Sequence, residues 1–175
     1  WIEADCPGSS GSLNLQTAQL CVSLSATSQT VTALRPKQQP GFDFTPGDLL
    51  AQRVGPGYFH LGDLTLRWRP SGVGAWQNTT TSASRAAVMA QTATGSTLAG
   101  ADLASVLPAG FPLRVTRRWV DEGGRLGLRF TLTNTGAAAI ELGALGIPMV
   151  FNHVITNRSL AQAHATCSFA DPYLG

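Results

Sequence analysis

The sequence has few charged residues and little excess of either sign. Charged residues make up 13% of its 175 residues, and 12 Lys and Arg against 10 Asp and Glu leave a formal net charge of +2. The basic residues are scattered apart from the short clusters Arg67–Arg69 and Arg117–Arg118. Because nucleic-acid binding needs basic residues concentrated on one face, we expect no nucleic-acid partner.

Long apolar runs are also missing. The longest candidate, Leu142–Phe151, is interrupted by Gly and Pro and falls short of the roughly 20 residues that span a bilayer, so we expect no membrane partner. The chain starts at Trp1 without Met, as after removal of a leader or after trimming of an expressed chain. Low charge and abundant Ser and Thr favour a secreted, extracellular protein.

Short catalytic motifs are absent: there is no GxSxG elbow, Walker loop, HExxH or GxGxxG. Neither a CxxC nor a Cys/His cluster at zinc spacing occurs, so we expect no metal and no cofactor. The glycines of Gly55–Gly57 and Gly72–Gly74 are typical of turns.

Three cysteines leave one unpaired. The favoured disulfide joins Cys6 to Cys21, because the Gly/Ser-rich stretch between them can close a loop of about 15 residues, a closure that stabilises by roughly 3 kcal/mol. The alternatives are two free thiols, or a bond from Cys21 to Cys167 if the first and last strands are neighbours. Cys167 would otherwise be a free thiol or bond a group outside the chain.

Two tripeptides match the N-glycosylation sequon, at Asn78 and at Asn157. Each would mark a surface loop if the protein passes through a eukaryotic secretory pathway.

Alternating apolar and polar residues dominate the chain. In Leu126–Asn134 the apolar residues recur at every second position, and Leu113–Val120 alternates in the same way, with Arg117 on the apolar side. Asp121–Gly124 lies between them and supplies turn glycines, so the two runs predict a β-hairpin. If this register is correct, Phe130→Ala leaves a large cavity and lowers the free energy of unfolding by roughly 3 to 5 kcal/mol, whereas Thr131→Ala lowers it little.

Similar runs separated by turn formers predict an all-β fold, an antiparallel β-sandwich. Residues 1–175 form one such domain or the N-terminal part of one. We expect a flexible segment over about residues 1–12. The further predicted strands are Leu20–Leu24, Val31–Leu34, Leu64–Trp68, Ala86–Ala90, Ile140–Leu142 and Met149–Phe151. Helical periodicity is weak; Ala99–Val106 and Ser159–Ala165 are short candidates that could equally be strand or turn.

The C-terminal stretch concentrates polar side chains in a chain otherwise poor in them, as a sugar-binding cleft requires. We interpret these residues together as a candidate cleft, although each alone could be a hydrogen-bonded strand end or turn residue. They are Asn152, His153, Arg158, Gln162, His164, Asp171 and Tyr173.

A second group combines aromatic and acidic side chains, in Phe42–Phe44 and in Tyr58–Asp63. Such residues bind sugars or form a core edge with their polar tips in water. Paired-carboxylate hydrolysis needs two carboxylates across one bond, and sequence separation alone nominates no pair among Asp43, Asp48, Asp63 and Asp171. For lyase chemistry, His164 and Tyr173 are candidates by residue type.

Several stretches resemble one family, DUF5695, of secreted six-hairpin-glycosidase-like proteins. They are Phe42–Pro46, Gly57–Leu66, Leu128–Asn134, Leu142–Met149 and Gln162–Phe169. The strand stretches are also similar to galactose-mutarotase-type sandwiches, of the supersandwich kind. The resemblance implies an N-terminal β-sandwich, incomplete in this chain, followed by a longer region, an (α/α)6 barrel that bears most catalytic groups.

Two functions follow from these observations. The chain is the N-terminal sandwich of a polysaccharide hydrolase or lyase, inactive alone, or it is a noncatalytic carbohydrate-binding or structural module. The expected partners are a poly- or oligosaccharide and a segment that completes the sandwich, from the remainder of the same protein or from a second chain. That segment should pack near Leu145–Phe151 and Ala165–Phe169 because unpaired sheet edges are a hazard.

Overall fold

The computed structural model describes residue 6 and residues 11–45 and 55–151. These residues form strands with two short 3-10 helices, which confirms the all-β prediction. In chain order the elements are β1 (Ser12–Gln16), β2 (Leu20–Ser25), β3 (Val31–Pro36), β4 (Thr65–Pro70), β5 (Gln77–Thr80), η2 (Thr81–Ala83), β6 (Met89–Gln91), β7 (Thr97–Asp102), η3 (Ala104–Val106), β8 (Leu113–Asp121), β9 (Leu126–Asn134) and β10 (Ile140–Gly146).

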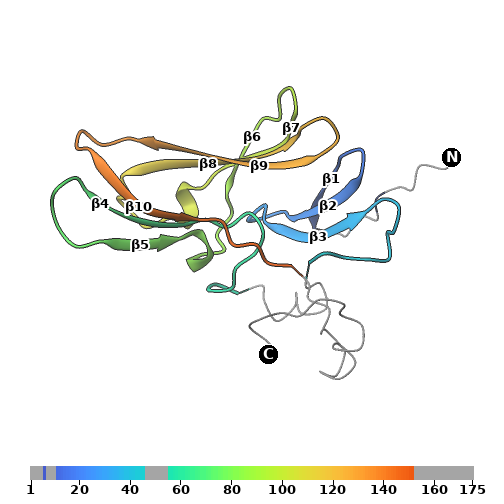
Figure 1. The fold of residues 1–175 in the computed structure, drawn as a ribbon, viewed down its shortest axis with the longest axis horizontal. Coiled ribbons are helices and arrows are strands. Elements are labelled where there is room, and N and C mark those ends of the chain that lie inside the picture. The colour runs from blue at the N-terminus through green and yellow to red at the C-terminus, as the bar shows by residue number, and fades with distance from the viewer. Residues whose placement is uncertain (1–5, 7–10, 46–54, 152–175) are drawn as a thin grey trace, which may run out of the picture.

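The strands form three antiparallel sheets, with strand orders β1-β2-β3, β10-β4-β5 and β6-β7-β8-β9. Figure 1 shows the four-stranded sheet as one layer, with β4, β5 and β10 opposite one end and β1–β3 toward the other. The architecture is therefore a β-sandwich in which one long sheet faces two smaller ones.

The predicted hairpin is formed by β8 and β9, with Leu113 opposite Asn134 and Trp119 opposite Leu128. Gly123 and Gly124 adopt positive φ in the turn, where residues other than glycine are strained. The alternation on β8 is confirmed, since its apolar side chains are buried. The apolar residues of β9 are only half-buried, because β9 is the last strand of its sheet.

The core has two parts. One packs β1–β3 against Trp119 and Ala99, and the other packs β4 against Val115 and Leu113 of β8. Arg117 lies on β8 between Val115 and Trp119 and points to the same face. A buried arginine therefore stands at the boundary between the two apolar clusters.

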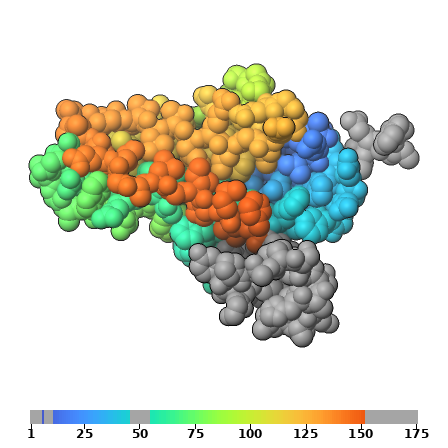
Figure 2. Space-filling view, in the orientation of Figure 1, coloured from blue at the N-terminus to red at the C-terminus, as the bar shows by residue number. Residues whose placement is uncertain are grey.

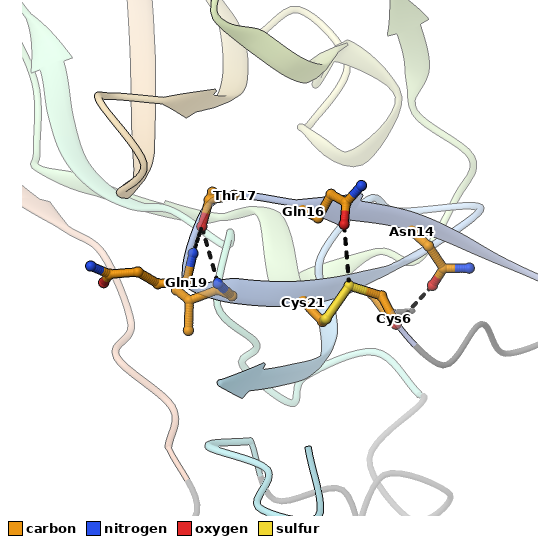
Figure 3. The surroundings of a disulfide bond; sticks show 8 residues. Cys6, Asn14, Gln16, Thr17, Gln19 and Cys21 are labelled. Carbon is orange, nitrogen blue, oxygen red and sulfur yellow. Dashed lines mark hydrogen bonds between the residues drawn. A yellow bond between two sulfur atoms is a disulfide. The ribbon is translucent and has the colours of Figure 1, made fainter. Parts of the chain in front are cut away.

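The disulfide between Cys6 and Cys21 is formed, with the Cα atoms 5.4 Å apart, which confirms the favoured pairing and excludes a bond from Cys21 to Cys167. Figure 3 shows how it attaches Cys6 to β2 beside the turn in which Thr17 Oγ1 accepts hydrogen bonds from the N–H groups of Gln19 and Leu20. Apart from Cys6, Gly11 and Ser12, the segment predicted to be flexible lies outside the described residues, as does Cys167.

Three predicted elements differ from the structure. Met149–Phe151 forms no strand, since it follows Pro148, which cannot donate to a ladder. The run Ala86–Ala90 contributes only its end to the short strand β6. The helical candidate Ala99–Val106 divides into the end of β7 and the 3-10 turn η3, which is the alternative that the sequence left open.

Strands β1 and β5 were not predicted. Both are short, and their sequences are SLNLQ and QNTT. The polar composition of β5 gives no apolar alternation to detect, because β5 forms the edge of its sheet.

Apolar side chains near β10 are exposed. Leu142 lies opposite Trp68 and Leu145 opposite Leu66, so they share the inward face with two buried residues, yet they are 49% and 51% exposed. Figure 2 shows this segment, in orange, at the surface along the molecule. We use the name β10 strip for its exposed apolar residues, Leu142, Leu145, Ile147, Met149 and Phe151.

Candidate functional site

The predicted cleft lies outside the described residues. This applies to all seven of its members: Asn152, His153, Arg158, Gln162, His164, Asp171 and Tyr173. The sequon at Asn157 and the carboxylate of Asp48 lie outside them as well. The sequon residue Asn78 is described, and it is exposed on the edge strand β5 rather than in the loop that was predicted.

The carboxylate of Asp43 has a structural role. Its Oδ1 accepts hydrogen bonds from the N–H groups of Leu34 and Thr45 at 3.0 and 2.9 Å, and its Oδ2 lies 3.1 Å from Arg35 Nη2. Phe42 and Phe44 stack edge to face beside it, with centroids 5.0 Å apart. This group therefore fixes the chain after β3 and presents half-exposed rings to solvent.

The other acidic candidate, Asp63, is buried in a polar network. Its Oδ1 accepts hydrogen bonds from Thr81 Oγ1 at 2.8 Å and from Arg85 Nη1 at 3.0 Å. Its Oδ2 accepts hydrogen bonds from the backbone N–H of His60 at 2.8 Å and from Arg85 Nη2 at 2.9 Å. Each carboxylate oxygen thus has two donors, so the carboxylate is satisfied as a buried charge must be.

Arg117 occupies the same region from the β8 side. Its Nη1 donates to the carbonyl of Gly62 at 2.6 Å, and its Nη2 donates to the carbonyl of Ser28. Trp119 Nε1 donates to the carbonyl of Gln29 at 3.1 Å. These bonds attach the β2–β3 turn and the turn before β4 to the centre of the long sheet.

Gly62 is required in this arrangement. Its φ is +102°, and a Cβ there would lie 2.9 Å from the Trp119 ring and 3.2 Å from Arg117 Nη1. A larger residue would both strain the backbone and displace the arginine.

We use the name seam cluster for Asp63, Arg85 and Arg117, which lie where the two apolar cores meet. Burial is the main influence on Arg117 and lowers its pKa to about 10; the charge of Asp63 opposes this and that of Arg85 adds to it. Arg117 therefore remains protonated at neutral pH, and the seam cluster contains two positive charges and one negative charge.

A pocket of about 240 Å³ opens beside the seam cluster. We call it the hydroxyl pocket; it is lined by Ser25, Thr27, Ser28, Thr30, Thr32, His60 and Arg85. A void of about 10 Å³ lies next to it, sharing Ser28, Thr30 and Arg85 and reaching Asp63 and Arg117. That void is about the size of one water molecule.

The hydroxyl groups of the pocket are arranged in pairs. Ser25 Oγ lies 2.9 Å from Thr27 Oγ1, and Ser28 Oγ lies 2.8 Å from Thr30 Oγ1. The Ser25–Thr27 pair is exposed, and since only one of its hydroxyls can donate to the other, the second O–H can donate to a bound molecule; the Ser28–Thr30 pair is buried. The pocket wall thus offers both donors and acceptors.

The described residues suit binding better than acid-base chemistry. The described residues give the pocket lining no carboxylate, and Asp63 behind it is already fully hydrogen-bonded. Within residues 11–45 and 55–151 together with Cys6, no group of three His, Cys, Asp or Glu side chains could hold a metal ion. No helix in the described part is long and apolar enough to cross a bilayer.

The hydroxyl pocket was not predicted from the sequence. Its residues come from the turn between β2 and β3, from His60 and from Arg85, and turns rich in Ser and Thr are common without function. The one available signal was the charge of Arg117 on the apolar side of an alternating strand, since a buried charge requires partners.

A family model described as a family of unknown function, DUF5695, matches residues 23–175. No curated protein and no solved structure matches the chain. The match extends from the middle of β2 through both core regions and the whole seam cluster, so the chain belongs to the DUF5695 family.

Proposed function

We propose that this domain is the N-terminal sandwich of a secreted carbohydrate-active protein and that its hydroxyl pocket binds one sugar unit of a poly- or oligosaccharide. The observation that carries the proposal is the convergence of five Ser and Thr residues, His60 and Arg85 on the lining of a single pocket. Sugar hydroxyls both donate and accept hydrogen bonds, and Ser and Thr hydroxyls do the same.

The size of the pocket fits one sugar ring better than a long chain. Clefts for drug-sized ligands enclose about 300–1,000 Å³, and this pocket encloses about 240 Å³. Tyr58 and Phe59 directly precede His60, and their rings are 49% and 37% exposed. Exposed aromatic rings near a polar pocket provide surfaces on which neighbouring sugar units stack.

Catalysis is assigned in this proposal to another part of the protein. Hydrolysis by paired carboxylates needs two such groups about 5 to 9.5 Å apart, and the described pocket lining contains none. The hydrolase or lyase activity would belong to a region beyond this chain, and the present domain would hold the substrate beside it. The alternative of a noncatalytic binding module is favoured by the same lack of a carboxylate pair.

Secretion is supported by two features of the described part. The Cys6–Cys21 disulfide is stable in oxidising compartments, and Asn78 of the sequon is exposed. In a eukaryotic host we expect a glycan on Asn78, which a deglycosylase would remove with a measurable loss of mass.

We further propose that the remainder of the same protein covers the β10 strip. Inward-facing leucines that are half exposed mark an incompletely covered apolar layer, and β10 pairs only with β4 among the described strands. The charge-neutral double substitution Leu145→Lys with Met149→Glu, here called the strip variant, should keep the free chain from self-associating.

The sugar-binding proposal is tested by removing hydroxyls from the pocket. In the strip variant, Ser25→Ala with Thr27→Ala should weaken the binding of an oligosaccharide about tenfold, since two hydrogen bonds at about 0.5–1.5 kcal/mol each are lost. The matched control is Thr131→Ala with Thr133→Ala on the exposed face of β9, which should leave affinity unchanged. Equal affinities for the two double variants, measured by titration calorimetry against a panel of oligosaccharides, would contradict the proposal.

A further inference from the structure

The hydroxyl pocket and the seam cluster contain more unused hydrogen-bond donors than acceptors. Among the described residues, the Nε atoms of Arg85 and Arg117 are buried without an acceptor, and Oε1 of Gln29 is the buried side-chain acceptor without a donor. The exposed Ser25–Thr27 pair adds a further O–H donor at the pocket. A bound molecule that satisfies this site must therefore be rich in acceptors.

The charges at the site favour the same kind of bound molecule. Arg85 and Arg117 together carry two positive charges, and the carboxylate of Asp63 balances one of them. Asp63 and Arg85 are the charged groups that act most strongly on Arg117, and among the described residues neither the pocket nor the adjoining void has another acidic residue in its lining. One positive charge thus remains uncompensated in a partly buried site, where screening by solvent is weak.

From these two surpluses we propose that the hydroxyl pocket selects a sugar that carries a carboxylate, a uronic acid, over a neutral sugar. The inference rests on the proposed sugar-binding function and specifies its substrate class. Arg85 is the residue that brings the charge to the pocket, since it lines both the pocket and the void and its side chain is 14% exposed. Arg117 lies behind it and is almost fully buried.

The experiment compares two ligands that differ only in charge, methyl glucuronide and methyl glucoside, by titration calorimetry at low ionic strength in the strip variant. We expect the glucuronide to bind about tenfold more tightly, and we expect added salt to reduce this preference. Equal affinities for the two ligands would overturn the selection of an acidic sugar while leaving sugar binding intact. Failure of both ligands to bind would overturn the proposed function itself.

A substitution at the pocket rim tests the location. Thr27 is exposed, so Thr27→Glu and Thr27→Gln should both fold, and both remove the same hydroxyl. Thr27→Glu should bind the glucuronide about tenfold more weakly than Thr27→Gln does, while the two bind the glucoside equally. Arg129→Gln changes the net charge by the same amount on the exposed face of β9 and should leave both affinities unchanged. Equal glucuronide affinities for Thr27→Glu and Thr27→Gln would contradict the proposed site.

Discussion

The seam cluster and the β10 strip depart from the usual distribution of residues in opposite ways. The seam cluster buries charged groups, and Asp63 is 1% exposed, whereas the β10 strip exposes apolar ones, and Met149 is 65% exposed. The buried charges have partners: Asp63 receives four hydrogen bonds and Arg117 reaches two carbonyls. The exposed apolar residues have no such compensation within the described part. Among the described residues, the seam cluster thus has partners for its buried side-chain groups except the Nε atoms of Arg85 and Arg117, whereas the β10 strip is left uncovered.

The largest effect is expected at the seam cluster. Asp63→Asn keeps the shape of the side chain but leaves Arg85 and Arg117 buried without a counter-charge, so it should cost about 3–5 kcal/mol of the free energy of unfolding. Glu122→Gln removes the partner of Arg129 in an exposed ion pair and should cost no more than about 1 kcal/mol. Urea denaturation of both variants measures the difference; equal costs would mean that the seam cluster behaves as a surface pair.

A smaller effect is expected on β9. Phe130 packs against the core cluster that contains β4, Val115 and Leu113, but it is only half-buried. Phe130→Ala should therefore lower the free energy of unfolding by about 2 kcal/mol, less than the 3–5 kcal/mol expected for a fully buried phenylalanine. Thr131→Ala on the exposed face should stay within about 0.5 kcal/mol. Thermal melting of the two variants tests the register, and equal shifts in Tm would contradict it.

The β10 strip should affect association more than stability. The free chain should self-associate in sedimentation velocity experiments, and the strip variant should sediment as a monomer with a stability change within about 1 kcal/mol, because both substituted side chains are mostly exposed. If the unsubstituted chain is already a stable monomer that unfolds in one transition, the strip needs no cover and the domain is complete.

The smallest effect is expected at Glu141, which lies on the outward face of β10. Its pKa is lowered mainly by a hydrogen bond from Arg69 and also by bonds from Gly72 and Ser71. A carboxylate whose pKa is depressed in the folded state stabilises above its unfolded value and loses this contribution as pH falls. Glu141→Gln should therefore lower Tm slightly at pH 7, and the difference should shrink as pH falls below about 4.5 and be lost once pH has passed the lowered folded-state pKa. A difference that is as large at pH 3 as at pH 7 would contradict this assignment.

Local patterns in the sequence predicted the parts of the fold that depend on near neighbours. The β8–β9 hairpin follows from two alternating runs and a Gly-Gly turn, and the Cys6–Cys21 bond follows from a short flexible loop. The seam cluster could not be predicted, because Arg117 finds its acceptors 55 and 89 residues away along the chain. Alternation showed only that a charge faces the core.

The same distinction applies to the candidate site. The hydroxyl pocket arises where the turn between β2 and β3 meets His60 and Arg85, and only the tertiary structure makes these residues neighbours. At Met149–Phe151 the apolar composition suggested a strand, but Pro148 and the absence of a neighbouring strand among the described residues leave the segment irregular. Composition identified an apolar segment, and the lack of a pairing partner decided its conformation.

A titration of the isotopically labelled strip variant with methyl glucuronide, followed by the chemical shifts of backbone amides and arginine side chains, locates the bound sugar. We expect the shifts to concentrate on Ser28, Thr30 and His60 and on the Nε–H signal of Arg85, because these residues line the hydroxyl pocket. Shifts confined to the neighbourhood of β10, or none at all at saturating sugar, would contradict it.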